Sequence, residues 1–394
     1  MNVVNSIYSQ VLFNVLFKYW MDNPSNMRTS TLAMLLILLV SIGLNIYFAS
    51  NQIIGEAGQT TTFSMTIEKT KTLTITTLET TRITESPYPL KIIDFMKRDI
   101  TIDKQPQRIV SCAPSITEIL AALELTEYIV GVDEYSDYPP EIKRFREEGI
   151  IENVGGVTTL NIEKILALRP DIVFVSPGVQ GGIVPILEEK GLTVVALDAS
   201  TVNDVYKEIL IVGKIMNIEY KALSLGNSIR DRIDYVQSKI TQVKSKTSVL
   251  SVIWLEPIWT AGNSTFLNDI IGYAGGYNVL VDSNGWFMTN PETIVTRNPE
   301  VIIVTAMSIG MKPEEVMEKL MSIPGFSSVN AVKNNRVYLL YGQAENVFLR
   351  PGPRIGEAVE LLAKILYPEI FNVEIPRTID EEYTKYLFTI SILA

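Results

Sequence analysis

Histidine is absent from the 394 residues of this chain, and cysteine occurs once, as Cys112. Without an imidazole group, Ser-His-Asp hydrolysis, histidine acid-base catalysis and nearly every zinc or haem site that needs such a ligand are excluded. A single cysteine excludes an internal disulfide, a CxxC redox pair and a cysteine-ligated metal cluster. Much enzyme chemistry is therefore ruled out before any motif is considered.

Positive charge is also scarce. Lysine and arginine total 34 and aspartate and glutamate total 44, which gives a net charge of 34 − 44 = −10. Proteins that bind nucleic acid usually carry a basic excess, so no nucleic-acid partner is expected. Apolar residues make up 47% and charged residues 20%, as in a folded chain with a sizeable core. The length predicts two or three domains of roughly 100–200 residues each.

Charged residues are missing altogether between Arg28 and Glu56. Within this gap, residues 32–49 are almost wholly apolar, and a helix of that length spans roughly 27 Å, close to the hydrocarbon thickness of a bilayer. Lys18 and Arg28 precede the apolar run, so the positive-inside rule puts the bulk of the chain outside the cell. We predict a single-pass transmembrane anchor in the cell membrane over residues 29–50, with a cleaved signal peptide as the alternative.

Two segments flank this anchor. Residues 1–28 are either a cytoplasmic extension or a mis-assigned start, with synthesis beginning at Met27. Residues 51–90 are rich in threonine, which next to a membrane span is typical of an extended, O-glycosylated stalk. Some of these threonines alternate with apolar residues, so a β-strand is the alternative, although the segment has no turn signal for a hairpin.

From residue 107 onward, short apolar runs alternate with longer amphipathic segments. This βαβ pattern predicts parallel sheets covered by helices. The predicted strands are 108–111, 171–176, 193–197, 249–254, 300–305 and 336–340.

One internal repeat indicates two related lobes. Residues 160–175 (LNIEKILALRPDIVFV) and 289–304 (TNPETIVTRNPEVIIV) match at a constant offset of 129 residues. Each copy predicts an N-capping asparagine, a short helix, a proline stop and a buried strand. We therefore expect an N-terminal lobe over 91–215 and a C-terminal lobe over 248–372, followed by a tail over 373–394.

The stretch between the two copies contains an apolar stripe at helical spacing. Its members are Ala222, Leu225, Ile229, Ile233, Val236, Ile240 and Val243. These steps of three and four residues predict one long helix within the linking segment 216–247. A helix of about 25 residues is roughly 40 Å long and would be a stiff strut between the lobes.

Two motifs follow predicted strands, at the edge where open α/β sheets bind ligands. In residues 108–120 (RIVSCAPSITEIL), Ser115 and Glu118 fit a capping box at the start of a helix, which makes Pro114 and Ser115 candidate ligand contacts. In residues 130–141 (VGVDEYSDYPPE), a strand runs into a loop with two tyrosines, whose flat rings and polar tips suit a large amphipathic ligand.

The order of these motifs resembles that of the class III solute-binding proteins of ABC importers. After the two just quoted come LNIEKILALRPDIV, then IWTAGNSTFLNDIIGYAGGYNV, then RPGPRIGEAVELLAKILYPE. The resemblance covers about residues 106–370 and is greatest to the cobalamin-binding branch. It implies an α/β fold of two Rossmann-like lobes joined by one long rigid α-helix, here preceded by the transmembrane helix and the Thr-rich stalk.

The resemblance also implies what the protein does. The implied ligand is cobalamin or an iron chelate, such as a siderophore complex or haem, and the implied partner is an ABC permease dimer with its ATPase. No enzymatic activity, resident cofactor or protein-bound metal is expected. The alternatives are an anchored ligand-sensing ectodomain without transport and a two-lobed enzyme of the metal-cluster or chelatase type.

Several residues take on ligand-binding roles through this resemblance. Tyr135 and Trp286 match aromatic positions of the family, and Trp254, near the end of a predicted strand, is a weaker candidate together with Trp259. Arg350 and Arg354, in FLRPGPRI, are candidates to grip a carboxylate or phosphate of the ligand.

The repeat adds a pair of acidic positions. In the family, one glutamate on each lobe docks onto arginines of the permease, and the matching residues are Glu163 and Glu292. Two equivalent carboxylates suit paired salt bridges with a symmetric dimer. From the residues alone, stabilisation of the helix dipole in a first turn is the simpler role.

Overall fold

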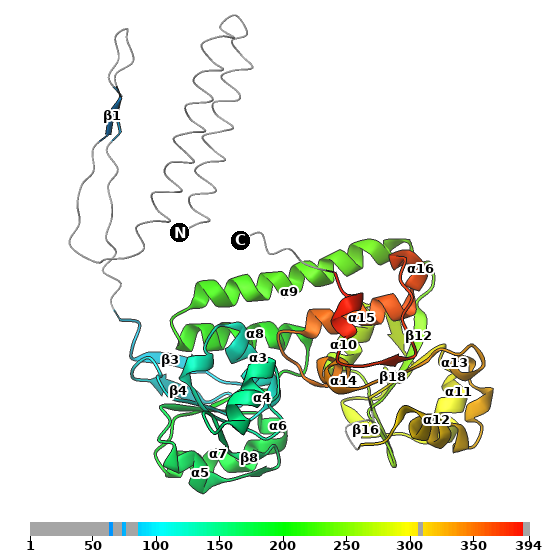
Figure 1. The fold of residues 1–394 in the computed structure, drawn as a ribbon, viewed down its shortest axis with the longest axis horizontal. Helices are drawn as coiled ribbons and strands as arrows, with labels where there is room; N and C mark the ends of the chain where they lie inside the picture. Colours follow the sequence, from blue (N-terminus) through cyan, green and yellow to red (C-terminus); the bar gives the residue numbers. More distant parts are fainter. Residues whose placement is uncertain (1–62, 66–72, 76–85, 306–309, 389–394) are drawn as a thin grey trace, which may run out of the picture. The chain divides into compact units, whose positions relative to one another are not determined.

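The computed structural model describes residues 63–65, 73–75, 86–305 and 310–388 (Figure 1). The chain divides into two compact units, Met1–Glu85 and Ser86–Ala394, which are considered separately. No helix within the described ranges is long and apolar enough to cross a membrane. The predicted anchor at 29–50 and the N-terminal segment 1–28 lie outside these ranges.

In the Thr-rich segment, the described residues form two paired strands. β1 (Phe63–Met65) runs antiparallel to β2 (Leu73–Ile75). For these residues the strand alternative is therefore confirmed, and the stalk role stays a prediction.

The second unit consists of two lobes, and the first lobe begins with a β-hairpin. Lobe 1 contains a five-stranded parallel sheet with the order β11-β10-β5-β6-β7. The strands of this lobe are β3 (Leu90–Ile93) and β4 (Asp99–Ile102) in the hairpin, β5 (Ile109–Ser111), β6 (Ile129–Val132), β7 (Glu152–Asn153), β10 (Ile172–Val175) and β11 (Val194–Ala196). Between β7 and β10 the chain forms a short antiparallel pair of strands, β8 (Gly155–Gly156) and β9 (Thr159–Leu160).

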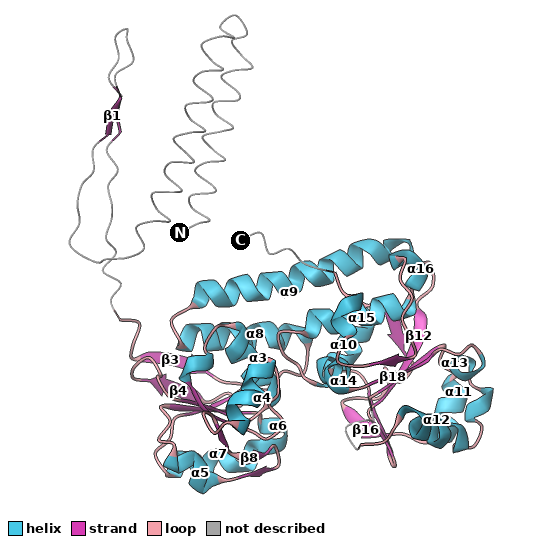
Figure 2. Cartoon of the chain, viewed as in Figure 1, coloured by secondary structure: helices cyan, strands magenta, loops and turns pink. Residues whose placement is uncertain are grey.

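Helices cover both faces of this sheet (Figure 2). They are α3 (Pro114–Ala122), α4 (Pro140–Glu147), α5 (Ile162–Ala167), α6 (Pro177–Gln180), α7 (Val184–Glu189) and α8 (Val202–Ile215). Along β10, Ile172 and Phe174 belong to the core shared with α3 and α8, whereas Val173 and Val175 belong to the core shared with α5 and α7. Burial on both faces explains why the strand reads as an unbroken apolar run.

Lobe 2 has a similar five-stranded parallel sheet with the order β15-β12-β17-β18-β19, whose fifth strand, β19, is added at the edge opposite to that of β7 in lobe 1. The strands are β12 (Thr247–Val252), β15 (Gly276–Asn278), β17 (Val301–Val304), β18 (Val337–Leu340) and β19 (Thr378–Ile379). The helices are α10 (Phe266–Tyr273), α11 (Pro291–Arg297), α12 (Pro313–Ser322), α13 (Asn330–Lys333), α14 (Gly342–Leu349), α15 (Ile355–Leu366) and α16 (Pro368–Phe371). The six strands predicted for the two lobes are therefore all present.

The internal repeat has the same structure in both lobes. Asn161 caps α5 by accepting a hydrogen bond from the backbone N–H of Lys164 (3.0 Å), and Asn290 caps α11 in the same way through Thr293 (2.8 Å). The strand that follows each helix, β10 or β17, pairs with the first central strand of its own sheet, β5 or β12. The predicted cap, helix and buried strand are confirmed in each copy.

Between the lobes in sequence is α9 (Glu219–Lys239), which runs along one side of the unit and packs against α8 of lobe 1 and α15 of lobe 2 (Figure 1). Its buried residues Ala222, Ile229, Ile233 and Val236 belong to the predicted stripe, but the α-helix ends at Lys239 and a short 3-10 turn follows. These residues are part of one apolar core that also includes Phe174 of lobe 1. The same core continues to Val301 of lobe 2.

Residues predicted as a C-terminal tail belong to lobe 2. β19 adds to the sheet beside β18, and Ile379 and Tyr383 are buried. Lys364 of α15 contacts the end of this segment, with its Nζ 2.5 Å from the backbone oxygen of Tyr386 and over the ring of Phe388. The C-terminal segment, defined here as residues 373–388, is thus an integral part of the lobe.

Candidate functional site

A small antiparallel sheet in lobe 2 carries an exposed apolar surface. It consists of β13 (Trp254–Leu255), β14 (Ile258–Ala261) and β16 (Trp286–Met288). The register puts Trp254 opposite Trp259, and Trp259 opposite Met288. In Figure 1, β16 lies at the edge of lobe 2 nearest to lobe 1.

Four large side chains share the outer side of this sheet. Directly opposed residues, and residues two apart on one strand, point to the same side. We call Trp254, Trp259, Trp286 and Met288 the aromatic face; their side chains are 37%, 37%, 42% and 59% exposed. A contiguous patch of this kind is typical of a binding surface rather than of the solvated surface of a monomer.

The inner side of the same sheet fixes these rings in position. Leu255 and Ile258 are buried in the core of lobe 2. The indole N–H of Trp254 donates to the backbone oxygen of Glu256 (3.0 Å). The ring of Trp286 packs against that of Phe266 with centroids 5.1 Å apart. Two rings of the aromatic face, those of Trp254 and Trp286, are therefore held by contacts within the protein.

Sequence reasoning identified this surface only in part. Trp254 and Trp286 are predicted ligand residues, and the structure brings them together on one sheet with Trp259. Met288 was missed. The alternation of large apolar residues at 286 and 288 is the signal that could have revealed it, because side chains two apart on a strand share a face.

In lobe 1, Tyr135 stands at the tip of the loop after β6. We call residues 133–138 the ligand loop, because it contains this predicted ligand contact. The side chain of Tyr135 is 56% exposed, and its hydrogen bond to Glu134 raises the pKa of the phenol above its usual value. Pro114 and Ser115, at the start of α3, are partly exposed. Tyr135 is thus accessible to a ligand.

The predicted capping box at Ser115 and Glu118 is wrong. The N-cap of α3 is Ala113, and no side chain caps the helix. Glu118 is instead buried, and its two carboxylate oxygens accept hydrogen bonds from the guanidinium of Arg354 at 2.6 and 2.8 Å. A carboxylate with a buried, bidentate arginine partner is not available to reach back to the helix start.

Arg350 and Arg354 therefore lie between protein carboxylates, although they are predicted to grip the ligand. Arg350 pairs with Asp137 (2.6 Å) and contacts Glu118 (3.2 Å). We call Glu118, Asp137, Arg350 and Arg354 the interlobe cluster, because its acids come from lobe 1 and its bases from lobe 2. Burial alone would lower the pKa of Arg354, but Glu118 outweighs it and raises that pKa.

The two predicted docking residues are both solvent-exposed. Glu163 lies in the first turn of α5 and Glu292 in the first turn of α11. A permease partner could therefore reach either carboxylate without any rearrangement of the lobe that carries it.

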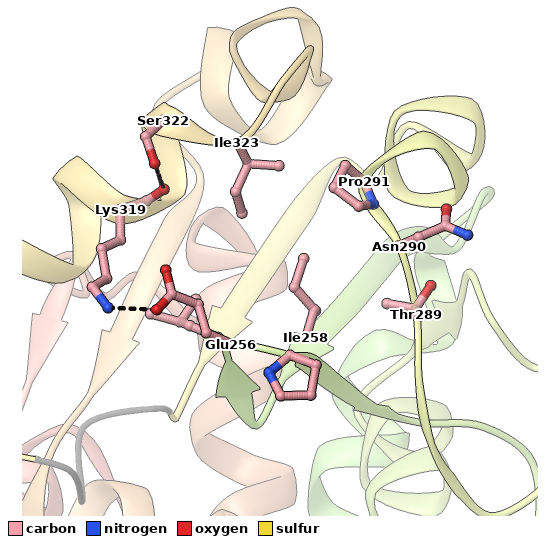
Figure 3. A pocket seen from close by; sticks show the side chains of 10 residues that line it. Glu256, Ile258, Thr289, Asn290, Pro291, Lys319, Ser322 and Ile323 are labelled. Carbon is pink, nitrogen blue, oxygen red and sulfur yellow. Dashed lines mark hydrogen bonds and ion pairs between the residues drawn. The ribbon is translucent and has the colours of Figure 1, made fainter.

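A pocket of about 400 Å³ lies within lobe 2, with Asn290 and Pro291 at the start of α11 in its lining (Figure 3). It opens between the turn of β13 and β14, the start of α11 and the end of α12. Ile258, Pro291 and Ile323 line it, and the ion pair of Lys319 with Glu256 (2.9 Å) is at its rim. No sequence motif pointed to this pocket.

Metal ligation by the protein has no support in the part of the chain that the structure describes. In these ranges, no group of three or more cysteine or carboxylate side chains is placed to hold a metal ion. Cys112 is completely buried, and burial raises the pKa of its thiol well above the usual value. It is a core residue of lobe 1 in this structure.

The fold and the sequence together define the class of protein. Residues 109–344 match the model of the periplasmic binding protein family, and the chain belongs to that family. The structure agrees with this assignment, because it has two parallel sheets covered by helices and a long helix, α9, between them in the sequence.

Individual relatives are similar over most of their length. The ABC transporter substrate-binding lipoprotein YvrC of Bacillus subtilis is 34% identical over 292 residues, which is 72% of this chain and 88% of that protein. The cobalamin-binding protein of Halobacterium salinarum is 24% identical over 71% of this chain and 74% of its own. Among solved structures, a periplasmic solute-binding protein of Staphylococcus epidermidis matches with a TM-score of 0.58 and 30% identity, covering 67% of this chain and all of that one.

Proposed function

We propose that this chain is the extracellular substrate-binding component of an ABC importer and that it captures cobalamin or an iron chelate. The observation that carries the proposal is the aromatic face, because four exposed apolar side chains on a fixed sheet suit a large, flat, partly apolar ligand. The names of the relatives, a substrate-binding lipoprotein and a cobalamin-binding protein, support the same class.

The partner in this proposal is a permease dimer with its ATPase. Glu163 and Glu292 occupy equivalent positions in the internal repeat, and both are exposed. Two equivalent carboxylates on two lobes can pair with arginines of two identical permease subunits. In this arrangement, α9 is the rigid connection that keeps the two carboxylates at a fixed spacing.

The proposal also includes attachment to the membrane. Residues 29–50 form the anchor, and the Thr-rich stalk separates the anchor from the lobes, so that the binding unit lies outside the cell. The lipoprotein name of the Bacillus relative supports membrane attachment of this class, although through a different chemical group.

Fluorescence offers a direct test of the ligand. The chain has four tryptophans, and three of them, Trp254, Trp259 and Trp286, form part of the aromatic face. In the full chain carrying Trp20→Phe, emission therefore comes from this face alone. Titration with cyanocobalamin, a ferric hydroxamate chelate or haemin should quench the emission at saturating binding.

Controls separate true quenching from absorption by the ligand. Free N-acetyltryptophanamide gives the inner-filter correction, and calorimetry gives an independent affinity. Trp259→Ala should weaken binding, because it removes the ring at the centre of the face, whereas Met321→Ala changes an exposed apolar residue elsewhere in lobe 2 and should not. If none of the three ligands binds, the ligand assignment is wrong.

A further inference from the structure

We propose that Arg350 is a positioning residue, which ties the ligand loop of lobe 1 to lobe 2 and, with the rest of the interlobe cluster, fixes the spacing of the lobes. The part that concerns ligand affinity rests on the proposed function, whereas the part that concerns spacing does not.

Arg350 bonds to the ligand loop at two points. Its Nη1 lies 2.6 Å from the carboxylate of Asp137, and its Nη2 donates to the backbone oxygen of Tyr135 (3.1 Å). Asn346, one turn earlier in α14, adds a longer contact from its amide to Asp137 (3.4 Å). The C-terminal end of α14 in lobe 2 therefore contacts the ligand loop on both sides of Ser136. One of these contacts is to the backbone of Tyr135, the predicted ligand residue.

Arg354 extends the same contact into the core. It binds Glu118 through both of its oxygens, lies over the ring of Tyr138 at 3.7 Å, and has its Nη1 3.3 Å from the hydroxyl of Tyr383. The backbone between the two arginines also approaches lobe 1, because a Cβ added at Gly352 would lie 3.4 Å from the carbonyl oxygen of Ser115. The contact is thus a close-packed junction.

Hydrogen bonds within lobe 1 hold the ligand loop in shape, so that the contact of Arg350 can fix the position of the loop relative to lobe 2. The carboxylate of Asp133 accepts hydrogen bonds from the backbone N–H of Tyr135 (2.8 Å) and from the hydroxyl of Ser136 (2.5 Å). Arg146 of α4 donates to the backbone oxygens of Asp133 and Ser136 at 3.2 and 2.7 Å. Lobe 1 therefore shapes the loop, and Arg350 connects the shaped loop to lobe 2.

Charge balance argues against a free arginine for the ligand. The two guanidinium groups of the interlobe cluster face two carboxylates, and the side chains of Glu118 and Arg354 are 2% and 6% exposed. A ligand carboxylate could gain Arg354 only by displacing Glu118, and leaving that buried carboxylate unpaired is costly. The cluster is therefore better suited to join the lobes than to recognise an acidic ligand.

The spacing can be measured with spin labels in the full chain. Lys143→Cys in α4 and Glu318→Cys in α12 provide one exposed label on each lobe, and the native Cys112 is buried and will not react. Arg350→Gln is the test variant, because Glu118 keeps Arg354 and Asp137 is partly solvated, so the variant should fold. We expect a broader distribution of interlobe distances by electron double resonance.

Two matched variants sharpen the result. Arg146→Gln loosens the loop from within lobe 1 and should broaden the interlobe distances less than Arg350→Gln does, because Arg350 and Arg354 still join the lobes. Arg297→Gln removes a surface partner of Asp282 in lobe 2 and should change neither distances nor affinity. An unchanged distance distribution in Arg350→Gln would overturn the spacing role.

The positioning role is tested by a double-mutant cycle with Tyr135. Arg350→Gln should weaken cyanocobalamin or haemin binding by roughly tenfold, and should have little further effect in a Tyr135→Ala background, since the residue acts through that side chain. Fully additive losses would overturn the positioning role. If the wild type binds neither probe, the proposed ligand is wrong, whereas the distance measurement still decides the spacing role.

Discussion

At the scale of single residues, Glu208 is the buried charge with the clearest consequence for stability. It lies in α8, is 2% exposed, and its Oε2 has no hydrogen-bond partner among the described residues. Burial raises its pKa well above the usual value, and the nearby Asp198 and Asp204 add to the shift. The folded state therefore binds this proton more tightly than the unfolded state does.

This linkage predicts how stability changes with pH. Above an unfolded pKa of about 4.3, the unfolded chain ionises Glu208 first, so its contribution to the free energy of unfolding falls as pH rises. Glu208→Gln should remove that loss and raise the free energy of unfolding at pH 7 by about 1 kcal/mol or more. Urea unfolding between pH 4 and pH 8 measures the difference from wild type, which should vanish at the acidic end.

Asp204, one turn earlier in α8, gives a control of opposite sign. Burial alone would raise its pKa, but Lys207 and Thr201 outweigh burial and lower it. Its carboxylate also completes the capping box of α8 with Thr201. Asp204→Asn should therefore lower stability at pH 7 by about 1 kcal/mol, and this loss should shrink as pH falls. If both variants shift in the same direction, the linkage argument fails.

At the scale of elements, the C-terminal segment should contribute strongly to stability. Ile375, Ile379 and Tyr383 are 8%, 1% and 1% exposed, and β19 completes the sheet of lobe 2. Truncation after residue 372 should lower the free energy of unfolding by about 5 kcal/mol, because three large apolar side chains are lost. Urea unfolding checks this, and an unchanged midpoint would contradict it.

A single substitution at Tyr383 measures what the polar contacts of the C-terminal segment contribute. The hydroxyl of Tyr383 donates to Glu357 (2.5 Å) and accepts from Arg354. Tyr383→Phe keeps the buried ring, so we expect a loss of only about 1 kcal/mol.

Elements also show which parts of the structure were predictable from sequence. Six strands of the two parallel sheets were found because their burial on both faces leaves a continuous apolar run, whereas β7, β15 and β19 were not predicted. The repeat was found because each copy has its own cap. The sheet β13-β14-β16 was missed, because its short strands expose one side to solvent and so leave no continuous apolar run.

The site was harder to predict than the fold for a related reason. Glu118 fits a local capping pattern, whereas its actual partner Arg354 lies 236 residues further along the chain. Local spacing contains no information about such a contact. The same holds for Arg350, which is predicted to grip the ligand but pairs with Asp137 and contacts Glu118.

At the scale of the whole molecule, the continuous apolar core predicts that the lobes unfold together. The core shared by α8, α9 and α15 extends into both sheets. Natural reporters exist for each lobe: Cys112 is buried in lobe 1, and the three described tryptophans lie in lobe 2. In the Trp20→Phe variant, pulsed thiol labelling and fluorescence should give the same urea midpoint. Separate midpoints would show that the lobes are independent.

The proposed docking onto a permease also depends on both lobes. Glu163→Ala with Glu292→Ala should leave ligand affinity as in the wild type and abolish uptake by cells that carry the cognate importer. Glu147→Ala with Glu382→Ala removes two other exposed carboxylates and should leave uptake intact. Normal uptake by the first pair of substitutions would remove the docking role.

The position of β19 in the chain has a consequence for biogenesis. A ribosome delivers residues 247–340, and with them the other four strands of the lobe 2 sheet, before it delivers Thr378–Ile379. Until those two residues emerge, one edge of a nascent apolar strand is open to wrong partners. Chaperone dependence during synthesis should therefore be greatest in the interval between completion of β18 and arrival of the last strand.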